Sequence, residues 1–265
     1  MPARLDSESA VNTVAFVDAG KSVAGSCADG KVRVWDAATG KLQRTIAKED
    51  LKPPYSAVVA GLSTSADGAL KATSQIPNKQ TSENLVTVRD ASGSKKFEVP
   101  AGIGGMSFLG FSPDASALVG ASYDADFRVW NVRNGELVRK VDELPVSMFA
   151  MSFSPDGKLL ATAGVDRIVY LWDTKTWKLA RKLAGHGEMI SALAFSADGK
   201  RIVTGGFREI TQAAPVKIVL WDSASGKMLR SFDAPRRVSS TAFSPDGKWI
   251  AAAFRDKTVQ IFAAD

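Results

Sequence analysis

The chain has 265 residues, of which 45% are hydrophobic, and its 34 Lys and Arg against 28 Asp and Glu give a formal charge of +6. This apolar content is ordinary for a soluble globular protein. The basic excess is spread along the chain rather than gathered in one run, which disfavours nucleic acid as a partner. Because no run of 18 or more apolar residues occurs, we expect no contact with a membrane.

Two residue counts restrict the chemistry. His186 is the only histidine, which excludes a metal site built from several histidines, and we expect neither a metal nor another cofactor. Cys27 is the only cysteine, so no intrachain disulfide is possible, and its place at the end of an apolar run predicts a small buried hydrophobe. The segment Met1–Ala10 contains Asp6 and Glu8 and lacks the apolar core of a secretory signal, so we expect a cytoplasmic location.

A unit of roughly forty residues recurs along the chain, and Val146–Leu183 shows it most clearly. Its first strand-like run, Phe149–Phe153, ends at the turn signal Ser154-Pro155-Asp156-Gly157. Further turns separate three more runs: Leu159–Ala163, Ile168–Trp172 and Lys178–Leu183. A small antiparallel sheet of this kind cannot bury both of its faces alone, so each unit needs a neighbouring copy on either side.

The chain contains six copies of the unit within one predicted domain, residues 1–265. In chain order, the copies cover approximately residues 11–46, 55–99, 104–141, 146–183, 189–232 and 238–263. The second copy is degenerate, because Arg89 stands where the other copies end their third strand with an aromatic residue. The second and fifth copies carry polar insertions between strands two and three, at Pro77–Asn84 and Arg208–Pro215. The sixth copy stops after its third strand, Val259–Phe262.

The spacing and the dipeptides at the ends of the third strands point to a family. The third strands end at Trp35, Arg89, Trp130, Trp172, Trp221 and Phe262. A base period of about 41 residues, with the endings Trp35-Asp36, Trp172-Asp173 and Trp221-Asp222, resembles the WD40 family of β-propellers. The resemblance covers nearly the whole chain. It implies an all-β fold in which six blades of four antiparallel strands surround a central channel.

The last blade lacks its outer strand unless the N-terminus supplies it. Propellers of this family are commonly closed by an N-terminal strand, and Met1–Leu5 would provide a short one at best. We therefore expect a six-bladed ring with a weak seam at the last blade. The alternatives are a fragment of a larger propeller and an edge completed by a second chain, since soluble proteins avoid uncovered strand edges. The oligomeric state is left open.

The resemblance also implies structural roles for several polar residues. The family's turn aspartate, which accepts backbone N–H bonds six residues before the tryptophan, corresponds to Asp29, Asp124, Asp166 and Asp256. Gly185-His186 matches the family's Gly-His pair, whose histidine bonds to that aspartate. In the fifth repeat, however, Pro215 occupies the position of the aspartate. His186 is therefore either a hydrogen-bonded structural residue or a solvated loop residue. Trp177, at a turn, is either an exposed contact residue or a cover for a blade edge.

One face of the ring is the candidate binding surface. In a propeller, the loops from strand two to strand three and from strand four to the next blade open on the same face, and both insertions are loops of this kind. Binding residues concentrate on such loops, although surface loops also accept neutral insertions. The candidates that should face the channel mouth are Tyr55, Met106, Phe149, Arg167, Met189, Arg208, Arg237 and Arg255. Arginine, methionine and aromatic residues are enriched at interfaces, and this set suits an acidic or extended peptide.

The expected function is a non-catalytic scaffold that binds a protein or peptide partner on this face. Two alternatives remain: a docking or sensor domain of a larger multidomain protein, and a propeller enzyme that uses the channel. The enzyme has the least support, because the turn aspartates sit in separate blades and do not converge as an acid–base pair must. Fold alone does not decide among the three.

Overall fold

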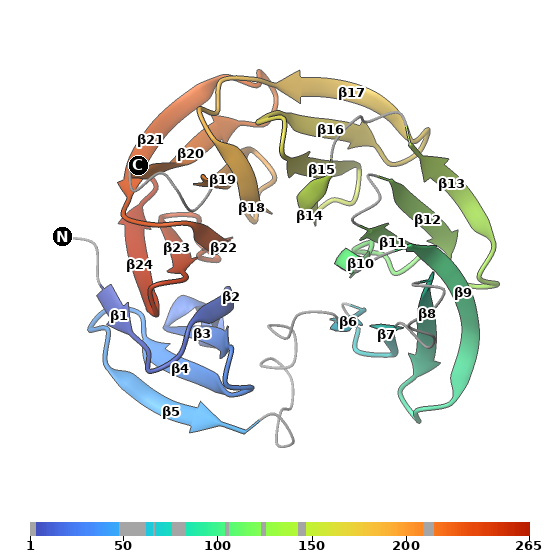
Figure 1. Ribbon diagram of the computed structural model, residues 1–265, viewed down its shortest axis with the longest axis horizontal. Coiled ribbons are helices and arrows are strands. Elements are labelled where there is room, and N and C mark those ends of the chain that lie inside the picture. Colours follow the sequence, from blue (N-terminus) through green and yellow to red (C-terminus); the bar gives the residue numbers. More distant parts are fainter. Residues whose placement is uncertain are drawn as a thin grey trace.

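The computed structural model describes residues 4–47, 62–65, 67–75, 83–103, 106–122, 126–142, 147–208 and 215–265. These residues form six sheets of four antiparallel strands each, and no α-helix occurs among them. Figure 1 shows the sheets arranged like blades round a common centre. The fold class predicted from the sequence, a six-bladed all-β propeller, is therefore confirmed.

In the first three blades the strands pair in chain order from the centre of the ring to its rim. Blade 1 consists of β2 (Val11–Val17), β3 (Ser22–Cys27), β4 (Val32–Asp36) and β5 (Leu42–Ile46), with the 3-10 turn η1 (Asp18–Gly20) after β2. Blade 2 consists of β6 (Leu62–Thr64), β7 (Leu70–Gln75), β8 (Glu83–Asp90) and β9 (Lys95–Ile103). Blade 3 consists of β10 (Met106–Phe111), β11 (Ala117–Ser122), β12 (Phe127–Asn131) and β13 (Leu137–Val141).

The next two blades follow the same order, and the sixth adds the N-terminal strand at its rim. Blade 4 consists of β14 (Met148–Phe153), β15 (Leu159–Gly164), β16 (Val169–Asp173) and β17 (Lys178–Leu183). Blade 5 consists of β18 (Met189–Phe195), β19 (Arg201–Phe207), β20 (Val216–Asp222) and β21 (Met228–Ala234). Blade 6 consists of β22 (Val238–Phe243), β23 (Trp249–Phe254), β24 (Thr258–Ala263) and β1 (Arg4–Asp6).

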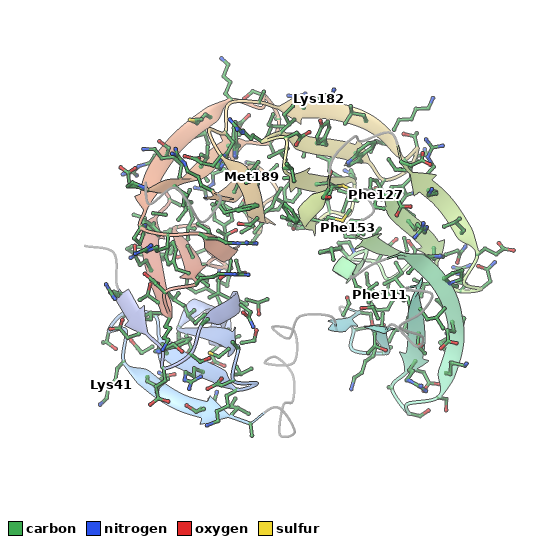
Figure 2. The ribbon with its side chains drawn as sticks, viewed as in Figure 1. Lys41, Phe111, Phe127, Phe153, Lys182 and Met189 are labelled. Atoms are coloured by element: carbon green, nitrogen blue, oxygen red, sulfur yellow. The ribbon has the colours of Figure 1, made fainter. Side chains whose placement is uncertain are left out.

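The strands differ in polarity according to their distance from the centre. Every residue of β3 is buried, as expected of an apolar strand covered on both faces. Most residues of the outer strand β17 are exposed. Figure 2 shows Lys182 of β17 at the rim and Phe127 of β12 further inside the ring. The gradient in the sequence from apolar to polar runs thus sets the order of strands in each blade.

A hydrogen-bonded turn joins the first and second strands of five blades. In blade 4 the Ser154 hydroxyl donates to Asp156 Oδ1 at 2.7 Å and accepts the backbone N–H of Leu159 at 2.9 Å. The same pair of bonds is made by Ser65, Ser112, Ser196 and Ser244. A serine and an aspartate two residues apart satisfy the backbone of a tight turn locally, so the turn signals in the sequence locate these hairpins.

The N-terminus closes the last blade, as one of the sequence-based alternatives proposed. Strand β1 pairs antiparallel with β24, with Arg4 opposite Gln260 and Asp6 opposite Thr258. Leu5 is completely buried, and Trp35 Nε1 donates to the Asp6 carbonyl at 3.2 Å. The free edge of β24 is thus covered from within the chain. That this seam is weak stays a prediction.

The core between blades is interrupted at one place within the described residues. Clusters of buried side chains join blades 2 and 3, 3 and 4, 4 and 5, 5 and 6, and 6 and 1. In blade 1, Val32 and Val34 belong to a cluster confined to that blade, and no cluster of described residues joins blades 1 and 2. Strands β2 and β6 stand apart in Figure 1. Arg89, which replaces the usual tryptophan in blade 2, is exposed.

The two insertions lie largely outside the described residues. Of the first, predicted at Pro77–Asn84, the last two residues belong to β8, which begins at Glu83. This boundary prediction was wrong, because the ladder with β9 extends back to the pair Glu83 and Ile103. Of the second insertion, residues 209–214 are outside the described part. The expectation that both insertions share one face therefore stays a prediction. Among the described residues, no helix has the length and apolarity needed to cross a membrane.

Candidate functional site

The turn aspartates are structural, as the resemblance implied. Asp29, Asp166 and Asp256 each accept the backbone N–H two residues further on, at 3.2, 3.3 and 3.1 Å respectively. Asp124 lies outside the described residues. Each of these three carboxylates is therefore held in the turn of its own blade.

His186 is a buried structural residue, which confirms the first of its two readings. Its side chain is fully buried, and its Nδ1 accepts the backbone N–H of Glu188 at 3.3 Å. Gly206 leaves the room that the ring occupies, since a Cβ there would lie 2.8 Å from His186 Cε1. Burial lowers the pKa of His186 below its ordinary value of 6.5, so the ring is neutral at pH 7.

Two further single residues are placed inside the fold. Cys27 is 4% exposed, as predicted for a small buried hydrophobe, and its Sγ contacts the Gly25 carbonyl at 3.7 Å. Trp177 is 9% exposed and belongs to the cluster between blades 3 and 4. Of its two readings, the structure confirms the one in which the ring folds back as a cover.

A cavity of about 540 Å³ opens on the end of the propeller where the candidate residues were predicted. It is called the arginine pocket here, and its principal lining residues are Val165, Arg167, Glu188, Met189, Phe207 and Arg208. They come from the turn between β15 and β16, the start of β18 and the end of β19. The backbone of Arg167 has a left-handed φ of 69°, a conformation that residues other than glycine rarely adopt.

Phe207 joins two more candidates to this pocket. Its ring meets that of Phe149 edge-on, with 5.5 Å between the centroids. The guanidinium of Arg237 also lies over the Phe207 ring, 4.3 Å from its centroid. Stacking on an aromatic face holds the planar guanidinium in place without neutralising its charge. The five predicted residues Phe149, Arg167, Met189, Arg208 and Arg237 therefore meet in one region.

A buried carboxylate holds one of the arginines. Glu188 Oε1 accepts a bond from the Arg208 guanidinium at 2.9 Å, and the Glu188 side chain is only 3% exposed. Its Oε2 lies 3.3 Å from His186 Nδ1. Because His186 is neutral, Glu188 balances one positive charge only. Among the residues that line the pocket, Arg167 and Arg208 are positively charged and Glu188 is negatively charged.

Sequence reasoning missed Glu188 and Phe207, and three candidates are not part of this region. Tyr55 lies outside the described residues, and of Met106 only the backbone position, at the start of β10, is described. Arg255 is exposed in the turn between β23 and β24 and does not line the pocket. The position of Phe207, a bulky aromatic residue at the end of the second strand of its blade, could have indicated that it faces the channel mouth.

No group of three or more His, Cys, Asp or Glu residues in the described part is close enough to hold a metal ion. The radial four-stranded sheets define a β-propeller. The family model "WD domain, G-beta repeat" matches residues 3–36, 142–173, 177–207 and 226–262, just over half of the chain. The chain therefore belongs to the WD40-repeat family. A search of curated proteins found no match.

Proposed function

We propose that this chain is a non-catalytic scaffold that binds an extended acidic segment of a protein partner in the arginine pocket. WD40 domains are typically protein-interaction scaffolds that bind proteins or peptides. The observation that supports the finer proposal is the convergence of Arg167 and Arg208 on one pocket beside Phe207. We further propose that residues 1–265 form a single domain. The cytoplasmic location expected from the sequence stays a prediction.

The geometry suits a carboxylate-bearing chain. The Arg167 guanidinium is exposed at the pocket, and arginine pairs with carboxylates through two parallel hydrogen bonds. Met189 and the exposed part of Phe207 add apolar surface to the lining. Desolvated aromatic and arginine anchors carry most of the binding free energy of interfaces. An extended peptide with alternating acidic and apolar residues would therefore use both kinds of contact.

A labelled peptide tests the proposal directly. The probe is fluorescein-labelled Asp-Glu-Leu-Asp-Glu-Phe-Asp-Glu, and its counterpart has lysine at every acidic position. Fluorescence anisotropy should show saturable binding of the acidic peptide, weakened by salt because the charges are screened. We expect the Arg167→Glu and Arg208→Glu double variant to weaken binding at least about tenfold.

The matched control is Arg133→Glu, which reverses an exposed arginine in the turn between β12 and β13. This turn follows a third strand and lies at the other end of the blade. The proposal fails if Arg133→Glu weakens binding as much as the double variant does, or if the lysine peptide binds equally well. A double variant whose circular dichroism differs from that of the parent is replaced by Arg167→Gln.

A further inference from the structure

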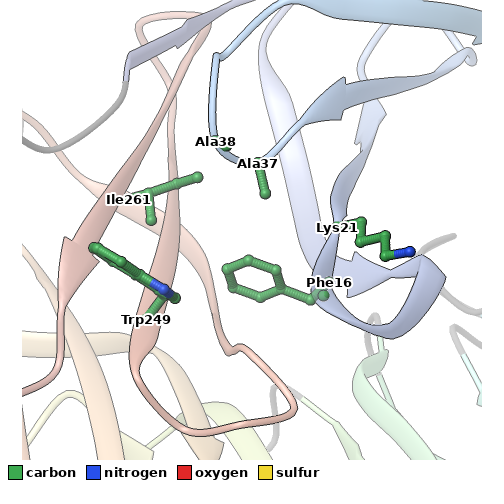
Figure 3. Close-up of a pocket in the computed structure, with 7 residues that line it drawn as sticks. Phe16, Lys21, Ala37, Ala38, Trp249 and Ile261 are labelled. Atoms are coloured by element: carbon green, nitrogen blue, oxygen red, sulfur yellow. The ribbon is translucent and has the colours of Figure 1, made fainter.

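A second cavity, of about 340 Å³, lies between blades 6 and 1, at the opposite end of the strands. It is called the seam pocket here. Figure 3 shows Phe16 facing Trp249 and Ile261 across it, with Ala37 and Ala38 above. Phe16 stands at the end of β2, Trp249 at the start of β23 and Ile261 within β24, while the two alanines belong to the turn after β4. The arginine pocket lies instead at the start of β18 and the end of β19.

Trp249 differs from every other tryptophan of the chain. It is 46% exposed, whereas each of the other five is 9% exposed or less. The indole N–H groups of Trp35, Trp172 and Trp221 all donate to oxygen atoms inside the protein. A half-exposed indole is a large apolar surface with a polar edge, the side chain most enriched in interface hot spots. Burying it further needs a ligand or a partner.

The blade on the other side of the pocket also departs from the repeat. Where five blades have the serine–aspartate turn, blade 1 has Val17 in place of the serine, followed by η1. Asp18 and Ala19 both have left-handed φ values, 52° and 54°. Two such residues in succession cost free energy that a glycine would not, and this kind of strain gathers at functional sites. The seam pocket thus coincides with two independent departures from the repeat.

We propose that the seam pocket binds an aromatic side chain from an acidic segment of a second protein partner. Its volume is near the lower limit of ligand pockets, about 300 Å³, which suits one aromatic ring between Phe16 and Trp249. Lys21 lies at the edge, and Figure 3 shows its ammonium directed outward, away from Phe16. No ion pair of Lys21 occurs within the described part, whereas the nearby Asp18 already faces Arg44 at 3.9 Å. The flexible lysine stem can turn this ammonium back toward an acidic residue next to the bound ring.

The inference goes beyond binding at the arginine pocket. The two pockets lie at opposite ends of the blades, so both can be filled at once. A scaffold with two such sites holds two partners together.

The exposed indole provides the readout. Because the other tryptophans are buried, quenching of the protein's fluorescence by acrylamide reports mainly on Trp249. The probe is acetyl-Asp-Phe-Asp-amide, which contains no tryptophan. It should protect Trp249 from acrylamide in a saturable manner, while acetyl-Asp-Ser-Asp-amide and acetyl-Lys-Phe-Lys-amide should not. We expect Lys21→Glu to raise the Kd of the probe, measured from this protection, about tenfold, which corresponds to 1.4 kcal/mol of binding free energy.

Two variants serve as controls. Lys248→Glu reverses an exposed charge one residue before Trp249 that does not line the pocket, and it should leave protection unchanged. The Arg167→Glu and Arg208→Glu double variant should also leave it unchanged, which separates this inference from the proposed function. The inference is overturned if the acidic probe gives no protection, or if Lys248→Glu weakens it as much as Lys21→Glu. Equal protection by phenylacetate would overturn it in favour of a small-ligand site.

Discussion

The buried arginine of blade 1 gives the sharpest stability prediction. The Arg33 side chain is 3% exposed, and its guanidinium donates two bonds to the Asp29 carboxylate, at 3.1 and 2.8 Å. Its remaining acidic partner, Glu8, lies at 3.2 Å but is 91% exposed. The substitution Asp29→Ala would therefore leave a buried cation with one weak, solvated partner. The bond from Arg33 is also the main reason that the pKa of Asp29 lies below its ordinary value.

The magnitude follows from the geometry. Removing one partner of a fully buried ion pair costs about 3–5 kcal/mol. Asp29 is 31% exposed and Glu8 remains, so we expect a smaller loss, about 2–3 kcal/mol. For a chain of this size, that corresponds to a fall of about 5–10 °C in Tm. Urea denaturation followed by tryptophan fluorescence would measure it.

Asp256→Ala is the matched control. Asp256 caps the equivalent turn of blade 6 by accepting the N–H and the hydroxyl of Thr258, and it forms no ion pair within the described residues. Losing such bonds should cost about 1 kcal/mol. The double variant Asp29→Ala with Arg33→Leu should recover part of the loss, because it also removes the stranded charge. Equal losses in the two single variants would refute the reasoning.

Three other predictions concern the seam, the histidine and the turns. Leu5→Ala should cost about 2–4 kcal/mol in urea denaturation because Leu5 is completely buried, while Leu229→Ala, at a residue 52% exposed, should be nearly neutral; equal costs would contradict a closed seam. Because the folded protein holds the pKa of His186 below 6.5, its contribution to stability is present above pH 6.5 and is lost as pH falls toward the folded pKa. Stability of His186→Phe should vary less over that range, and an unchanged slope would argue against the burial. The Ser154 hydroxyl is the main cause of the lowered pKa of Asp156, so Ser154→Ala should raise that pKa toward 3.8 in an NMR titration; a pKa that does not move would show that the bond is absent.

The blades could be predicted because their determinants are local and repeated. The turn at Ser154 and Asp156 is specified within six residues, and the same spacing recurs in four other blades. The resemblance to the WD40 family implied a capping role for Asp166, six residues before Trp172, and the bond from the Ile168 N–H bears this out. Patterns of this kind need no knowledge of how distant parts of the chain meet.

The site was harder to predict because its contacts join residues that are distant in the sequence. Glu188 and Arg208 are twenty residues apart and meet only after β18 and β19 pair. The burial of Arg33 was missed for a related reason, since its partners come from the N-terminal segment and the adjacent turn. Arg89 was noticed as an exception to the aromatic pattern. The lack of a cluster of described residues joining blades 1 and 2 became visible only with the packing.

The pairing of β1 with β24 has a consequence for how the protein is made. Ribosomes extend a chain from its N-terminus, so Leu5 emerges long before Thr258–Ala263, the strand against which it must be buried. Blades 1 to 5 can each assemble from neighbouring segments as they are translated. Blade 6 has to wait until Thr258–Ala263 has been translated. Among the described strand pairs, this closing step joins the residues farthest apart in the sequence and so has the largest loop-closure cost, and we expect it to be the slowest stage of folding.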